Sequence, residues 1–170
     1  DLVRALERMF RRAGIELAMS EGFHPKPRMS FAAPLALGMA GLDEVLEVGL
    51  VEWIEPERLL AALNAEAPEG ISFRTAEHLA AESKKAQAAR LCFEVPLPAE
   101  CVELARDRVA GFLAAPSWLV ERPDREAPVD LRPLVEQLEV ADGVLSMRLK
   151  VINEAGARPR DLLAALELTN

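Results

Sequence analysis

Residues 20–30 hold the densest set of side chains that could take part in chemistry, in the order Ser-Glu-Gly-Phe-His-Pro-Lys-Pro-Arg-Met-Ser. The two prolines of this loop fix their own φ angles and favour extended backbone at the residues before them. We therefore expect a stiff strip that displays His24, Lys26 and Arg28. A guanidinium can bind a carboxylate or phosphate through two hydrogen bonds, an ammonium adds a point charge, and an imidazole titrates near neutral pH. The pattern predicts a site for an anionic ligand.

Further side chains near this strip extend the same positive field or offer hydrogen bonds. They are Arg8, Arg11, Arg12, Ser20 and Ser30. Catalysis would need a general acid, base or nucleophile within the strip, and only His24 and Glu21 are candidates for that role. The same residues are also compatible with a structural turn, since surface charges are usually solvated and paired locally.

The charge of the chain is unevenly distributed. The 170 residues carry a formal net charge of −8, which argues against non-specific binding to nucleic acid or to an anionic membrane. The first 40 residues nevertheless carry +2, from six basic and four acidic side chains, so the rest carries −10. Aromatic residues make up only 5% of the chain, so any base-stacking platform is small. We expect neither DNA nor a membrane as a partner.

The cysteines argue against a metal site or a disulfide framework. Cys92 and Cys101 are the two cysteines, and neither has paired histidines nearby. We expect Cys92 in the core of a strand and Cys101 early in a helix. The chain also lacks the cysteine cluster that an iron–sulfur enzyme needs. With no leader and no apolar run of membrane-spanning length, this composition favours a cytoplasmic protein.

The elements that must position the strip follow from apolar spacing and from turn residues. Helical spacing predicts helices over 2–13, 56–65, 99–114 and 159–168. Apolar and alternating runs predict strands over 15–20, 29–33, 43–52, 71–76, 90–97, 118–122, 134–140 and 144–152. The last two strands form a hairpin that turns at 141–143. Residues 77–89 are polar and alanine-rich, which indicates a linker or a short helix.

This order predicts an α+β chain of two tandem ferredoxin-like (split βαβ) halves with antiparallel sheets, residues 1–80 and 86–170. Each half is one strand short of such a unit at a chain end, where we expect a longer polypeptide to continue. The octapeptides that begin at Pro56 and Pro159 match at six of eight positions, which indicates an internal duplication.

The runs Asp1–Arg8, Arg11–Gly14, Ser20–Gly38 and Leu63–Gly70 resemble the radical SAM-linked domain family of unknown function. The resemblance covers residues 1–76 and is only architectural beyond them. It implies a radical SAM protein or domain as the partner. That partner would carry the iron–sulfur cluster and S-adenosylmethionine, with no cofactor in this chain, which would hold or present a substrate.

A fainter similarity, through Leu63–Glu69 and the tandem halves, is to the pseudouridine synthases that act on tRNA. It implies RNA as the ligand, but the loop 20–30 holds no aspartate to match their catalytic one. The sequence therefore favours an accessory domain without independent catalysis, which binds an anionic ligand, RNA, through this loop. The alternatives are a pseudouridine-synthase-like RNA-modifying enzyme and a pure protein-interaction module.

Overall fold

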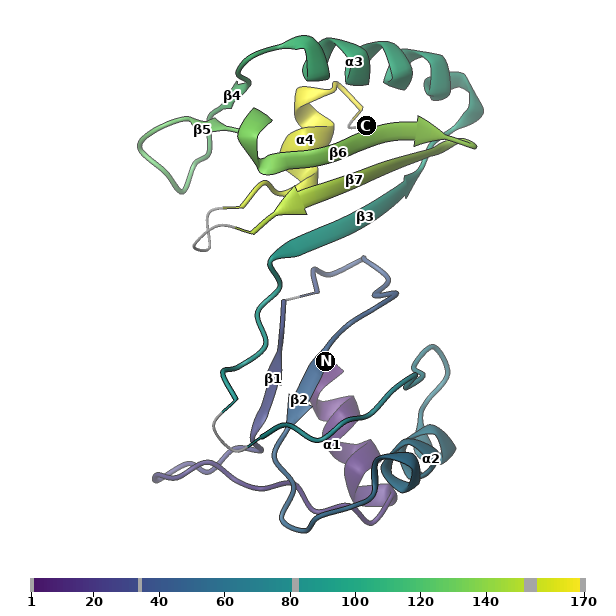
Figure 1. Ribbon diagram of the computed structural model, residues 1–170, viewed down its shortest axis with the longest axis vertical. Coiled ribbons are helices and arrows are strands. Elements are labelled where there is room, and N and C mark those ends of the chain that lie inside the picture. Colours follow the sequence, from purple (N-terminus) through teal and green to yellow (C-terminus); the bar gives the residue numbers. More distant parts are fainter. Residues whose placement is uncertain (1, 34, 81–82, 152–155, 169–170) are drawn as a thin grey trace. The chain divides into compact units, whose positions relative to one another are not determined.

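The structure is a computed structural model that describes residues 2–33, 35–80, 83–151 and 156–168 (Figure 1). It divides into two compact units, residues 1–87 and 88–170. The expected α+β class is confirmed, because the described residues form four α-helices and small antiparallel sheets. Among these residues, no helix has the length and apolar character needed to cross a membrane.

The core of the first unit lies between two helices and short extended segments. Helix α1 (Leu2–Arg12) follows the predicted apolar spacing, and α2 (Pro56–Glu66) opens on a proline, whose missing N–H is not needed in a first turn. Both helices pack with β1 (Met29–Phe31) and β2 (Leu46–Val48). The buried residues of this core are Leu6, Met9, Phe10, Ile15 and Leu63.

Strand pairing in the first unit is shorter than the sequence predicts. Residues 15–20 form only isolated bridges, Leu17 with Leu50 and Met19 with Pro27, and the predicted strand 43–52 is confined to β2. Instead, the three extended segments around Ala18, Arg28 and Gly49 each form backbone hydrogen bonds with the other two. Their backbone N–H groups donate from Ala18 to Gly49 at 2.8 Å, from Arg28 to Ala18 at 2.7 Å and from Gly49 to Arg28 at 2.8 Å. Because each segment pairs with both others over a short length, no long ladder forms.

The predicted strand 71–76 is absent from the structure. Backbone groups of this segment form hydrogen bonds with a side chain instead of with a neighbouring strand. The Asn64 amide donates to the Phe73 carbonyl at 2.8 Å and accepts from the Phe73 N–H at 2.8 Å. Arg74 donates to the Leu42 carbonyl at 2.6 Å. These bonds satisfy backbone groups that a neighbouring strand would otherwise pair. The segment is thereby held in irregular backbone.

The second unit contains a three-stranded antiparallel sheet in the order β3-β7-β6. Strands β3 (Arg90–Pro96) and β6 (Val135–Ala141) therefore run parallel on either side of β7 (Val144–Lys150). A 3-10 turn (Ala99–Cys101) and α3 (Val102–Ala114) lie between β3 and β6 in the chain. This is a βαβ unit split by a third strand. A tandem ferredoxin-like arrangement is not confirmed, because in the described first unit the sheet has only the strands β1 and β2.

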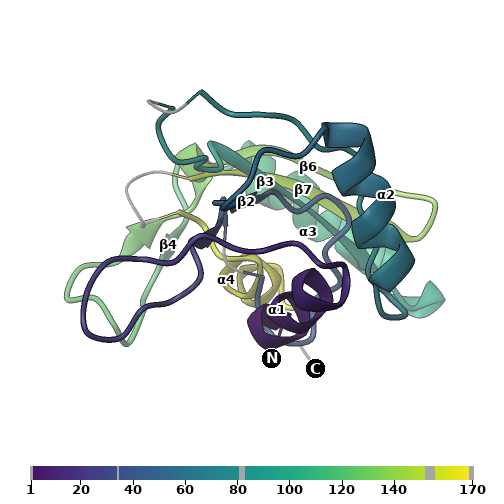
Figure 2. The same ribbon diagram turned by 90° about the horizontal axis from the view of Figure 1, so that it is seen from below.

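Two helices cover one face of this sheet, as Figure 2 shows for α3 and α4 (Pro159–Ala165), the latter shorter than predicted. The β6–β7 hairpin turns where the sequence predicts. Asp142 and Gly143 have φ angles of 50° and 75°, the left-handed values that a two-residue hairpin turn needs. The fully buried large side chains of this core are Phe112, Leu131, Leu145, Met147, Leu149, Leu162 and Leu166.

The predicted strand 118–122 is reduced to β4 (Leu119–Val120), which pairs with β5 (Val129–Asp130). A second 3-10 turn (Arg132–Leu134) leads from β5 to β6. Asp130 Oδ1 accepts hydrogen bonds from the N–H groups of Trp118 at 2.8 Å and Arg132 at 3.0 Å. These bonds favour the charged carboxylate and hold the pKa of Asp130 below its usual value.

Candidate functional site

The loop 20–30 begins as a hairpin with two extended arms. The Ser20 N–H donates to the Lys26 carbonyl at 2.8 Å, and the Lys26 N–H donates to Ser20 Oγ at 3.0 Å. The Arg28 N–H continues the pairing to Ala18 at 2.7 Å. The Ser20 hydroxyl, expected as a ligand-binding group, therefore closes the hairpin in this structure.

Three of the expected binding side chains are exposed on this hairpin. His24, Lys26 and Arg28 make no side-chain hydrogen bond or ion pair within the described part of the chain. Lys26 and Arg28 are two residues apart on one extended arm, so their side chains share a face. Their backbone groups are held by the pairing above while their charged groups face solvent, which is the arrangement that an anion-binding strip needs.

Phe23, at the tip of the hairpin, is a candidate site residue that the sequence analysis did not single out. Its side chain is fully exposed, at 102% of the reference area. Gly22 before it has a φ of 120°, a backbone conformation that favours glycine. The low aromatic content of the chain predicts only a small stacking surface. A single ring can still stack on a base when it is exposed, so the position of an aromatic residue decides more than the number of aromatic residues. An exposed ring on the same hairpin as two exposed cations can stack on a planar ligand.

Three of the arginines of α1 were expected at the site, and they differ in what they contact. Arg12 Nε lies 3.0 Å from Glu66 Oε2, and Arg12 Nη2 donates to the Glu66 carbonyl at 2.6 Å. Arg12 therefore joins the ends of α1 and α2. Arg8 and Arg11 are exposed and have no ion pair among the residues that the structure describes. These two remain available as outer positive charges.

Ser30 and Glu21 complete the expected set. Ser30 Oγ donates to Glu47 Oε2 at 3.3 Å across the β1–β2 pair. The other oxygen, Glu47 Oε1, accepts from the Ala86 N–H at 2.7 Å, so Glu47 ties the segment after residue 77 to β2. Glu21 is exposed beside the hairpin tip. The Ser30 hydroxyl thus bonds to Glu47 within the unit, whereas the side chains of Glu21 and His24 are exposed to solvent.

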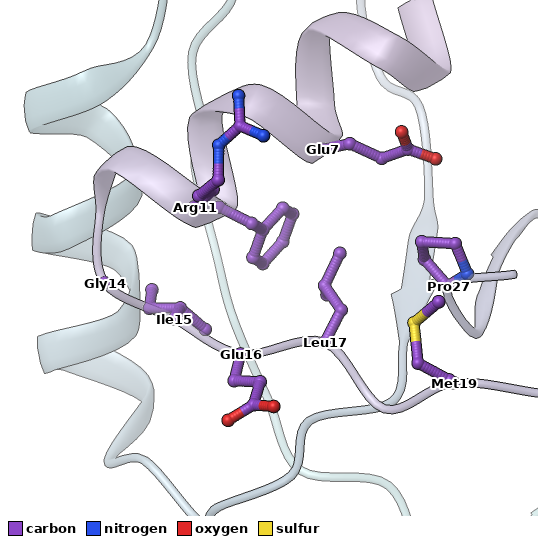
Figure 3. A pocket seen from close by; sticks show the side chains of 9 residues that line it. Glu7, Arg11, Gly14, Ile15, Glu16, Leu17, Met19 and Pro27 are labelled. Carbon is purple, nitrogen blue, oxygen red and sulfur yellow. The ribbon is translucent and has the colours of Figure 1, made fainter.

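An open pocket of about 400 Å³ lies between α1 and residues 14–19, with Pro27 at one side (Figure 3). Its lining includes Phe10 and Leu17, and Figure 3 shows Leu17 pointing toward α1. Glu7 and Arg11 project from α1 in different directions above it. The charges around the pocket are therefore mixed rather than uniformly positive.

The pocket and the cationic strip occupy different faces of the hairpin. Pro27 lines the pocket, and it alternates along the arm with Lys26 and Arg28. Alternate residues of extended backbone point to opposite sides, so the two cations face away from the pocket. The strip and Phe23 are then the part of the site that suits an extended anionic ligand. Within the described ranges, no group of three or more His, Cys, Asp or Glu could hold a metal ion.

A family model described as an uncharacterised protein conserved in bacteria (DUF2344) matches residues 1–159. The chain belongs to the DUF2344 family. The DUF2344 match includes the hairpin, both core helices of the first unit and the three-stranded sheet of the second. No curated protein matches the chain, and no solved structure does.

Proposed function

We propose that this chain is a recognition domain without catalysis of its own, which binds single-stranded RNA through residues 20–30 and acts beside a radical SAM protein. One observation carries the RNA proposal. A fully exposed aromatic side chain, Phe23, stands on the same hairpin as two exposed cations, Lys26 and Arg28, that share a face. Proteins that bind single strands combine a positive track for the backbone with aromatic rings on which bases stack.

The electrostatics of the chain set the kind of binding to expect. The hairpin lies in the only basic quarter of a chain of net charge −8. Long-range attraction of RNA is therefore weak, and affinity depends on a few local contacts. The hairpin backbone is already ordered, so binding loses little conformational entropy there. We expect a modest affinity that falls as salt rises.

Replacing Lys26 and Arg28 together by alanine should weaken binding of a single-stranded RNA oligonucleotide and flatten its salt dependence. The slope of log affinity against log salt should decrease by about 0.7 for each phosphate that is no longer bound, roughly 1.4 in total. Fluorescence anisotropy over a salt series measures both effects. The matched control is Lys84→Ala/Lys85→Ala, which removes the same charge from exposed positions in segment 77–89. Equal slopes for the wild type and the hairpin variant would contradict the proposal.

The proposed partner follows from the resemblance of residues 1–76 to radical SAM-linked domains. The iron–sulfur cluster and S-adenosylmethionine belong to that partner. The loop between β1 and β2 supports a protein contact in the same unit, because exposed apolar side chains gather there and such patches commonly mark interaction surfaces. They are Leu35, Leu37, Met39, Leu42 and Val45.

Leu37→Ser should weaken the complex of this chain with the proposed radical SAM partner. Leu37 is fully exposed, so the substitution leaves the fold intact. Without the burial of this side chain, the complex is weaker by about 1.5 kcal/mol or more, roughly tenfold in affinity. Surface plasmon resonance with the purified partner measures the change. Leu104→Ser on α3 is the control, and equal affinities for the two variants would argue against this loop as the contact.

A further inference from the structure

We propose that the open edge of β3 pairs with β3 of a second copy of this chain. The contact is antiparallel and two-fold symmetric, and it joins two three-stranded sheets into one. Strand β3 pairs with β7 on one side, and no other strand of the described residues pairs with it on the other. A seven-residue edge with unpaired backbone groups is a template for another strand.

The hydrogen bonds between β3 and β7 show which residues of β3 direct their backbone groups to the open edge. The Val151 N–H donates to the Ala89 carbonyl at 3.0 Å, and the Leu97 N–H donates to the Gly143 carbonyl at 2.8 Å. Bonded pairs alternate along an antiparallel ladder, so the odd-numbered residues of β3 bond to β7. The even-numbered residues direct their N–H and carbonyl groups outward. In the part of the chain that the structure describes, Arg90, Cys92 and Glu94 have neither of these two groups paired at this edge.

These free groups are complementary to a second copy of themselves. With the two-fold axis at Cys92, this residue faces Cys92 of the second copy and Arg90 faces its Glu94. Every outward N–H of the three residues then meets an outward carbonyl, and the side chains opposite each other carry unlike charges. Arg90 Nε already lies 2.6 Å from Glu136 Oε2, and the remaining guanidinium nitrogens stay available for Glu94 of the second copy.

The other edge of the sheet, β6, is less suited to self-pairing. It has a register shift between Val135 and Gln137, and bulges of this kind disrupt an edge. Its seven residues include the exposed acids Glu136 and Glu139 but no base, so a second copy of β6 offers no unlike charge. Strand β3 has a regular register and balanced charges. The self-complementary edge is therefore that of β3.

Cys92 provides a direct test, because it is exposed in β3 rather than buried as the sequence predicts. Opposite Cα atoms of a bonded antiparallel pair are about 5.5 Å apart, within reach of a short bis-maleimide crosslinker. The Cys101→Ser protein, which keeps Cys92, should give a crosslinked dimer. The Cys92→Ser protein, which keeps Cys101, should not. Light scattering should show the molar mass of the untreated wild type doubling as concentration rises.

A charge exchange separates the proposed pairing from a general effect on folding. Glu94→Arg places two arginines opposite each other and should return the protein to a monomer. Arg90→Glu/Glu94→Arg restores unlike charges and should restore the dimer, although it removes the Arg90–Glu136 contact. Glu139→Arg, on β6, is the control that leaves the dimer unchanged. A monomer at every concentration would overturn the proposal, and so would a dimer unaffected by Glu94→Arg. If the outward β3 amides of such a monomer resisted hydrogen exchange, the edge of β3 would be covered within one chain.

Discussion

The Arg122→Ala protein is expected to lose about 3 kcal/mol or more of the stability of its second unit, because removing one partner of a buried ion pair leaves the other charge uncompensated. Arg122 follows β4 and is only 4% exposed. Its Nη2 lies 2.7 Å from Asp161 Oδ2 in α4 and donates to the Gly156 carbonyl at 3.0 Å. A decrease of this size is a large share of the stability of a typical domain.

Denaturant unfolding followed by tryptophan fluorescence can isolate this effect. The chain has two tryptophans, and Trp53→Phe leaves Trp118 of the second unit as the reporter. Arg158→Ala is the matched control, because Arg158 pairs with Asp124 at the surface and its removal should cost far less. Arg122→Met/Asp161→Leu should recover much of the stability by removing both charges. Equal unfolding midpoints for Arg122→Ala and Arg158→Ala would contradict the role assigned to the buried pair.

Phe23→Ala is expected to weaken binding of single-stranded RNA by about 1–3 kcal/mol, roughly five- to 150-fold, the usual effect of removing one base-stacking ring. The thermal stability of the protein should stay unchanged, since the fully exposed Phe23 side chain packs against nothing that unfolding would expose. Anisotropy with the same RNA oligonucleotide measures the affinity, and calorimetry measures the stability. The combination of weaker binding and unchanged stability distinguishes a ligand-binding residue from a structural one.

Substitutions of matched exposure sharpen this test. Leu37→Ala removes an equally exposed apolar side chain from the same unit but outside the hairpin, and should leave RNA binding unchanged. Phe23→Trp keeps an aromatic face and should preserve affinity, whereas Phe23→Leu keeps only apolar area and should not. If Phe23→Leu binds RNA as well as the wild type, the ring does not stack on a base.

Elements encoded by local signals could be predicted from the sequence. Helix α1 follows the spacing of its apolar residues, and the β6–β7 turn follows from Asp142 and Gly143, which accept the left-handed backbone that the turn needs. The segments 15–20 and 71–76 could not be predicted, because strand formation depends on the partner that folding brings beside a segment. For Phe73 that partner is the side chain of Asn64.

For the candidate site too, one part could be predicted from the sequence and another part depends on tertiary contacts. By itself, the sequence determined which side chains carry charge near residues 20–30 and that the prolines there stiffen the backbone. Only the tertiary structure decided which of those side chains stay available. Arg12 is taken by Glu66, 54 residues away, and Ser30 by Glu47, 17 residues away, whereas Phe23 and Arg28 remain in solvent. The physical reason is that ion pairs and hydrogen bonds form between segments that only folding brings into contact, and no local pattern reports those distances.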